Sequence, residues 1–192
     1  MYIDQELCQK CLDCRPVCPV DAFRIEDKKV VIDYDTCVEC GVCLRMAVCP
    51  EGAIKQVEQI PYPRIVRALF SDVLQTHEHT GIAGRGTEEM KTNDVTAMYG
   101  PDEIGFSVEL GRPGVGARLS ELEKVVKKVF SMGYRLAADN PVTPMIVDHD
   151  TGALRPELLD EKVLSAIAEF KVPASDALAV VDEMSAFLNR EL

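Results

Sequence analysis

The sequence predicts an α+β protein made of two units, and three observations support this prediction. All eight cysteines of the 192-residue chain lie between residues 8 and 49, which separates a cysteine-rich first unit from the rest. That first unit contains an internal repeat. From residue 103 onward, alternating apolar residues and stretches of helical period follow one another, as expected for strands and helices. We therefore expect a first domain at 1–58, a linker helix and polar loop at 59–102, and a second domain at 103–192.

The repeat in the first unit consists of two copies of one pattern. Each copy has an Ile-Asp pair, then three cysteines at intervals of three, and then a Cys-Pro pair. The first copy comprises Ile3-Asp4, Cys8, Cys11, Cys14 and Cys18-Pro19, and the second comprises Ile32-Asp33, Cys37, Cys40, Cys43 and Cys49-Pro50. Between the copies, residues 22–33 predict a β-hairpin that turns at Asp27-Lys28, and residues 53–57 predict the matching strand of the second copy. Two copies of one pattern indicate two copies of one site.

The cysteine spacing indicates metal binding. We see no export signal at the N-terminus, and disulfides are rare in reducing compartments, so metal is favoured over disulfides. A zinc site commonly takes two separated pairs of ligands, which three equally spaced cysteines do not supply. An iron–sulfur cube suits them better, because each thiolate then binds a different iron corner. Structural zinc ions, disulfides and a cluster pair with a purely structural role are the alternatives.

The first copy fits the cluster-binding run C-x2-C-x2-C-x3-C-P, in which the fourth cysteine ligates the other cluster. Residues 1–58 therefore resemble a bacterial-type ferredoxin with two 4Fe-4S clusters. The resemblance implies crossed ligand sets, with Cys8, Cys11, Cys14 and Cys49 on one cluster and Cys37, Cys40, Cys43 and Cys18 on the other. The second copy departs from the run by a five-residue gap before Cys49. We expect a longer loop at 44–48, where Leu44 and Val48 are placed to shield a cluster from water and shift its potential.

The bulk composition narrows the class of partner. The formal net charge is -11, which disfavours binding to nucleic acid and to anionic membrane surfaces, because both depend on cationic groups. The charge suits a basic docking face on a protein partner, or simply keeps the protein in solution. No apolar run is long enough for a membrane span, and we expect a cytoplasmic protein.

A helix and a polar loop are expected to connect the two units. Apolar residues recur at helical spacing over residues 64–74. The long polar stretch that follows is typical of a flexible or a functional loop. His77 and His79 fit a metal-binding pair or an exposed loop, and Gly84-Arg85-Gly86 fits an anion-facing turn or a plain one. We interpret this stretch as a docking loop, a loop that faces a partner's cofactor, or a solvated loop.

The second unit is expected to be a small α+β sandwich of ferredoxin-like topology. Its predicted strands are 104–110, 134–138 and 144–147, and its predicted helices are 117–132, 157–170 and 176–189. Ser120 and Glu123 fit a capping box, and Ser175 fits the cap of the last helix. The strand, the GRPGVG turn at 111–116 and the helix resemble an ACT-type regulatory domain, although Arg112 stands where that family has an acidic residue. The resemblance implies amino-acid binding near the turn.

The pattern as a whole favours electron transfer. Four cysteines fill all four iron corners of each cluster, which leaves no iron open for a substrate, and no catalytic motif occurs elsewhere. We expect an electron-transfer subunit of anaerobic metabolism that serves a larger redox enzyme carrying a flavin or metal cofactor. One alternative is a redox-linked regulatory protein whose ACT-like domain binds a small metabolite. Another is a reductase with a flavin held at 84–118.

Overall fold

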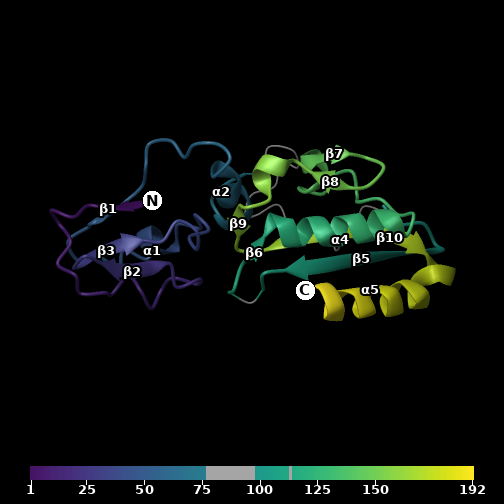
Figure 1. Cartoon of the computed structure of the whole chain (residues 1–192), viewed down its shortest axis with the longest axis horizontal. Helices are drawn as coiled ribbons and strands as arrows, with labels where there is room; N and C mark the ends of the chain where they lie inside the picture. Colours follow the sequence, from purple (N-terminus) through teal and green to yellow (C-terminus); the bar gives the residue numbers. More distant parts are fainter. Residues whose placement is uncertain (77–97, 113) are drawn as a thin grey trace.

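The computed structural model describes residues 1–76, 98–112 and 114–192. Figure 1 shows the cysteine-rich unit at one end, with the N-terminus, and the α+β unit at the other end, with the C-terminus. Helix α2 (Ile65–Ser71) lies between them. Within the described ranges, no helix is both long enough and apolar enough to cross a bilayer.

The first unit is built from two short strand pairs that reproduce the sequence repeat. β1 (Tyr2–Ile3) pairs with β4 (Ile54–Lys55), and β2 (Phe23–Glu26) pairs with β3 (Lys29–Ile32), both antiparallel. Each pair therefore joins the start of one copy to the end of the other. The predicted hairpin is confirmed, and both residues of its Asp27-Lys28 turn have positive φ, as a tight two-residue hairpin requires. The predicted strand at 53–57 is confirmed in its central residues.

A small apolar core supports these strands. Its buried members are Met1, Cys14, Phe23, Val30, Ile32 and Ile54. Five further cysteines pack partly buried against these side chains, namely Cys8, Cys18, Cys37, Cys43 and Cys49. So small an apolar core is marginal for an independent domain, and metal clusters commonly supply the missing stabilisation.

The predicted helix at 64–74 is confirmed in shorter form as α2. It buries Val66 and Phe70 in the large core of the second unit. Arg64, which precedes α2, and Arg67 within it contact the first unit. The segment expected to be a linker therefore takes part in the packing of both units.

The second unit is organised around one long antiparallel strand pair. β5 (Glu103–Leu110) pairs with β10 (Ala166–Pro173) over eight residues, with Phe106 opposite Phe170. Helix α4 (Leu119–Ser131) packs on β10 through an apolar stripe. Buried on this helix are Leu119, Leu122, Val125, Val126, Val129 and Phe130. Helix α5 (Ala177–Glu191) adds Val180 and Met184 to the same core.

Short elements complete the second unit. β6 (Ala117–Arg118) pairs with β9 (Lys162–Val163), and β7 (Ile146–Asp148) pairs with β8 (Ala153–Leu154). The single-turn helices η1 (Thr143–Met145) and η2 (Pro156–Leu158) flank the β7–β8 pair along the chain, and η3 (Ala174–Asp176) connects β10 to α5. Among the described residues the strands form five separate pairs. The α+β content was expected, but the ACT-like arrangement is not confirmed.

The helix predicted at 157–170 is wrong, because this segment forms η2, β9 and β10. Residues 166–170 of β10 are all buried, so both faces of the strand are covered. A strand buried on both faces reads as a continuous apolar run, which periodicity cannot distinguish from a buried helix. Pairing with β5 over eight residues then decides in favour of the strand.

Other local predictions are corrected in part. The strand expected at 134–138 is reduced to one bridge between Leu136 and Phe170, and the strand expected at 144–147 begins only at Ile146, after η1. The α4 cap lies two residues earlier than predicted, because the Glu121 carboxylate accepts the backbone N–H of Arg118 at 2.8 Å. Ser120 is already inside the helix. The final helix is confirmed, although Asp176 and not Ser175 precedes its first residue.

Candidate metal centre

Two cavities in the first unit divide the eight cysteines into two sets of four. The first set lines one cavity and comprises Cys8, Cys11, Cys14 and Cys49. The second set lines the other cavity and comprises Cys18, Cys37, Cys40 and Cys43. We call these cavities the first site and the second site. Each takes three cysteines from one copy of the repeat and the Cys-Pro cysteine from the other. This grouping is the one that the resemblance implied, and the role of these cysteines as ligands stays a prediction.

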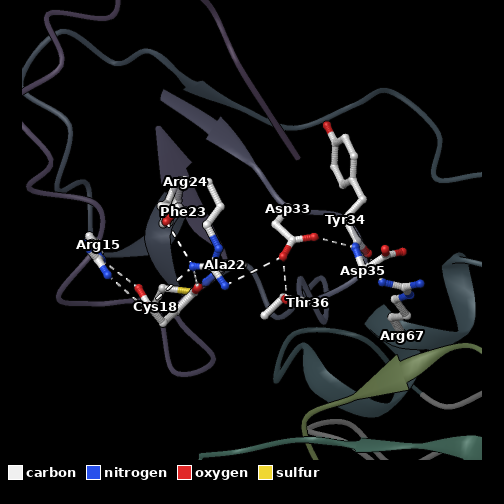
Figure 2. A network of polar contacts seen from close by, with 11 residues as sticks. Arg15, Cys18, Ala22, Phe23, Arg24, Asp33, Tyr34, Asp35, Thr36 and Arg67 are labelled. Carbon is white, nitrogen blue, oxygen red and sulfur yellow. Dashed lines mark hydrogen bonds and ion pairs between the residues drawn. The ribbon is translucent and has the colours of Figure 1, made fainter. Parts of the chain in front are cut away.

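Each copy enters its cysteine loop through the same turn. The Asp4 carboxylate accepts the N–H of Glu6 at 3.0 Å, and the carbonyl of Asp4 accepts the N–H of Cys8 at 3.1 Å. Asp33 makes the equivalent bonds to Asp35 and Cys37, at 3.0 and 2.8 Å. Figure 2 shows the Asp33 turn with Thr36 bonded to the same carboxylate. The Ile-Asp pair of the repeat thus positions the first cysteine of each loop.

The loops then curl around the cavities through residues with positive φ. Lys10 (62°) and Leu12 (67°) occupy the positions in the first copy that Glu39 (54°) and Gly41 (70°) occupy in the second. Backbone that alternates between right- and left-handed conformations turns successive N–H groups toward one concave side, as at many anion and iron–sulfur sites. The loop conformation therefore suits a bound group with negatively charged sulfur atoms.

The sulfurs of the two Cys-Pro cysteines, Cys18 and Cys49, also accept hydrogen bonds. We call these two the exchanged cysteines, because each lines the cavity of the opposite copy. The Ala22 N–H donates to the sulfur of Cys18, and the Ala53 N–H donates to the sulfur of Cys49, both at 3.2 Å. The Cys18–Ala22 contact is visible in Figure 2. Hydrogen bonds to ligand sulfurs stabilise the thiolate form and tune iron–sulfur potentials.

The geometry fits a cluster better than a single ion or a disulfide. All eight cysteines are free. Among the described residues, no group of three or more Cys, His, Asp or Glu side chains is close enough together to hold one metal ion. A zinc site gathers four sulfurs at about 2.3 Å from one centre, whereas a cube spreads them over four irons. Each cavity is lined by four cysteines, one for each iron corner of such a cube.

The protonation of the thiols supports the same interpretation. Burial, together with the charge of its three neighbours in the first site, raises the pKa of Cys14 to about 11. Burial likewise raises the pKa of Cys37 to about 11 and of Cys43 to about 12, with neighbouring negative charge adding to the effect. The pKa of Cys40 is also raised, mainly by burial, although the charge of Arg45 opposes the shift. Four thiolates at such a site need compensating positive charge, which iron ions supply.

The two sites differ in their surroundings. In the first site Cys11 is exposed, whereas in the second site Cys40 is buried. Glu39, between Cys37 and Cys40, is also buried, and it accepts a hydrogen bond from Arg64 at 2.7 Å. Arg45 and Arg67 reach the same loop, as described below. These arginines and their partners were missed by sequence reasoning, because contacts between distant residues leave no local pattern.

Helix α1 (Val42–Arg45) spans Cys43 and ends within the gap before Cys49. Leu44 and Val48 pack partly buried against the core of the first unit. That these two side chains shield a cluster from water and shift its potential stays a prediction.

The turn at 111–116 has a packing role that sequence reasoning also missed. A Cβ on Gly111 would lie 2.6 Å from the carbonyl oxygen of Leu164, and one on Gly116 would lie 2.9 Å from that of Val163. A Cβ on Gly114 would lie 3.5 Å from the carbonyl oxygen of Pro19, next to Cys18. The glycines thus allow close packing, and Arg112 forms an ion pair with Glu109. The predictions for His77, His79 and Gly84–Gly86 lie outside the described residues.

Comparisons with known proteins agree with the site. Residues 1–50 match the family model of a 4Fe-4S dicluster domain. A ferredoxin of Methanocaldococcus jannaschii is 48% identical over 56 residues, which cover 28% of this chain and 87% of that protein. Ferredoxin-1 of Caulobacter vibrioides is 45% identical over 56 residues, or 28% of this chain, and the chain spans only 48% of its length. A ferredoxin of Saccharopolyspora erythraea is 27% identical over 133 residues, 68% of this chain and 93% of that protein.

Proposed function

This chain belongs to the ferredoxin family through its N-terminal segment, and we propose that it relays single electrons through two 4Fe-4S clusters to or from a larger oxidoreductase. The proposed ligands of one cluster are Cys8, Cys11, Cys14 and Cys49. Those of the other are Cys37, Cys40, Cys43 and Cys18. A four-iron cluster supplies a one-electron redox couple when bound at such a site.

The observation that carries the proposal is the division of the cysteines between two cavities. Three thiols on one loop cover one side of each cavity, and one thiol from the opposite copy closes it. Four cysteine ligands leave no coordination position open, so the chain's own residues do no bond-making chemistry there. They hold the redox group, exclude water from it and donate hydrogen bonds to its sulfur ligands.

The two sites differ in exposure, and this difference supports a proposal for which site faces the partner. Cys11 reaches the surface, so a partner's cofactor can approach the first site closely. The second site is covered by α2 and by the turn at 111–116. We propose that electrons pass between the chain and the larger redox enzyme at the first site. The partner carries the flavin or metal cofactor, and the second unit contributes to docking.

Counting iron and sulfide on the tagged chain after anaerobic purification tests the proposal. Two 4Fe-4S clusters require about eight irons per chain. Replacing Cys11 or Cys40 by Ala is expected to leave about four irons and to abolish electron transfer. The matched control is Asp13→Ala, which changes an exposed side chain of the same loop and is expected to keep all the iron. Full iron content and transfer in both cysteine variants would contradict the proposal.

The partner is tested in the same preparation. Chains that co-purify in fixed proportion with the tagged protein are identified, and their bound flavin or metal is measured. A stoichiometric oxidoreductase supports the role of a subunit. Full iron content with no such partner, even after mild cross-linking, would contradict that role while leaving the clusters in place.

A further inference from the structure

Two arginines connect the second site to residues outside the ferredoxin segment. The first, Arg67, is a buried residue of α2. Its guanidinium donates to the backbone carbonyl of Cys37 at 2.8 Å and also to the carbonyl of Tyr34. It forms an ion pair with Glu161, which is buried in the second unit. Figure 2 shows Arg67 beside the loop of Tyr34 and Asp35 that leads to Cys37.

The second arginine is Arg45, at the end of α1. Its guanidinium donates to the backbone carbonyl of Cys40 at 2.6 Å. The same group forms an ion pair at 2.5 Å with Asp72, a buried residue that directly follows α2. Two cysteines of the second site are therefore each contacted, through their main chain, by a cation. Each cation is anchored by a carboxylate from beyond the ferredoxin segment.

The first site has no such arrangement. In the described part of the chain, no side chain donates to the backbone carbonyl of a first-site cysteine. Arg15, in the first copy, instead pairs with Asp21 at the surface. The repeat therefore makes the two cysteine sets alike, and the arginines make their surroundings different.

We propose that Arg45 and Arg67 are positioning residues through which α2 and the second unit raise the reduction potential of the second site relative to the first. Reduction adds one negative charge at the site. A positive charge held nearby stabilises that state, and the burial of Arg67 weakens solvent screening of its attraction. Asp72 and Glu161 fix the arginines in place and offset part of their charge. This inference rests on the proposed function, because it requires two bound clusters.

The test is a potentiometric titration of the full-length, cluster-loaded chain, in which electron paramagnetic resonance monitors the reduction of each cluster. Arg45→Gln and Arg67→Gln are expected to lower the midpoint potential of one cluster only. Asp72→Asn and Glu161→Gln are expected to raise it, because each removes a negative charge and leaves its arginine uncompensated. Arg15→Gln is the matched control, since it removes one arginine charge from the exposed pair, and both potentials are expected to stay close to the wild-type values.

The sign of the shifts separates a charge effect from a structural one. If the arginines only hold the loop, removing either member of a pair loosens the same loop and moves the potential in the same direction. Such a result would overturn the inference, as would no shift, or equal shifts in both clusters. Cys11→Ala, which retains the second site alone, assigns the signal that moves. If Arg67→Gln fails to incorporate iron, the less buried pair of Arg45 and Asp72 decides the question.

The iron content of the wild-type chain keeps the two proposals distinguishable. Wild-type protein without two four-iron clusters would overturn the proposed function, and this inference with it. If the wild-type protein binds two clusters and none of the four substitutions changes either reduction potential, the inference alone is overturned.

Discussion

The two cysteine sites have the same local sequence plan and different surroundings. In both, an Asp turn leads into three cysteines, two residues with positive φ curve the loop, and a backbone N–H bonds the sulfur of the Cys-Pro cysteine. The first site lies at the surface through Cys11, whereas α2 and the second unit cover the second site. A sequence repeat thus specifies equal sets of cysteines, while residues outside the repeat decide how each site is covered and charged.

The largest expected effect comes from replacing the exchanged cysteines. Cys18→Ala is expected to remove the same cluster as Cys43→Ala, although Cys18 lies in the first copy of the repeat. Cys49→Ala is expected to remove the same cluster as Cys14→Ala. Electron paramagnetic resonance of the four variants, with iron counts, compares the remaining signals. If Cys18→Ala instead matches Cys14→Ala, each copy binds its own cluster and the crossed ligand sets are wrong.

The next largest effect concerns the ion pair of Arg67 and Glu161, which joins the second site to the second unit that covers it. Arg67→Ala leaves the buried Glu161 carboxylate without its ion-pair partner, and breaking a buried pair in this way costs about 3–5 kcal/mol. We expect a clear loss in the free energy of unfolding, measured by anaerobic urea denaturation of the loaded chain. Arg15→Ala breaks an exposed pair in the first copy and is the control, with no measurable change expected. If Arg67→Ala loses no more stability than Arg15→Ala, the buried ion pair does not stabilise the fold.

A smaller effect concerns access to the two sites. Mild oxidation of the loaded chain with ferricyanide is expected to destroy the first site several-fold faster, because Cys11 is exposed and Cys40 is buried. Stopped samples analysed by electron paramagnetic resonance give the two rates separately. The Cys11→Ala and Cys40→Ala chains, each with one remaining cluster, assign the rates. Loss of both signals at one rate would mean that the cover over the second site does not limit access.

The resemblance implied the same two groups of four cysteines that line the two cavities, because the pattern that carries it is local. The role of these cysteines as ligands stays a prediction. The hairpin and helix α4 were also predicted, since turn chemistry and an amphipathic stripe are local signals. The five-residue gap drew attention to residues 44–48, but not to the role of Arg45, which depends on Asp72.

The missed features depend on contacts between distant residues. Arg67 and Glu161 are 94 positions apart, and nothing near either residue in the sequence identifies the other as its partner. The strand at 166–173 was mistaken for helix for a related reason. Its apolar residues suit both structures, and only pairing with residues 103–110 distinguishes them. The ACT-type resemblance implied amino-acid binding near the turn at 111–116, but close packing of Gly111 and Gly116 against a neighbouring backbone leaves the same sequence signal.

The smallest expected effect is a pH dependence of the cluster-free chain. Burial raises the pKa of Cys14 and Cys37 to about 11 and that of Cys43 to about 12, above the ordinary value of 9.0. The folded state therefore binds protons more tightly than the unfolded state. The resulting contribution to stability is fully present below pH 9 and is lost as the pH rises toward 11 and 12. Urea midpoints at pH 7 to 10.5 measure this loss, and tyrosine and lysine titrations cancel when variants are compared with the wild type.

The same titration can compare the two sites. Two of the three strongly shifted thiols, Cys37 and Cys43, belong to the second site, and Cys14 belongs to the first. The double variant Cys37→Ser and Cys43→Ser is therefore expected to flatten the alkaline dependence more than Cys14→Ser does. If the two variants flatten the alkaline dependence equally, burial of the thiols contributes equally to the pH dependence of stability in both sites. Because these thiols are protonated at neutral pH without iron, assembly of either site must release protons, and the more buried second site is expected to require the more alkaline medium for its assembly.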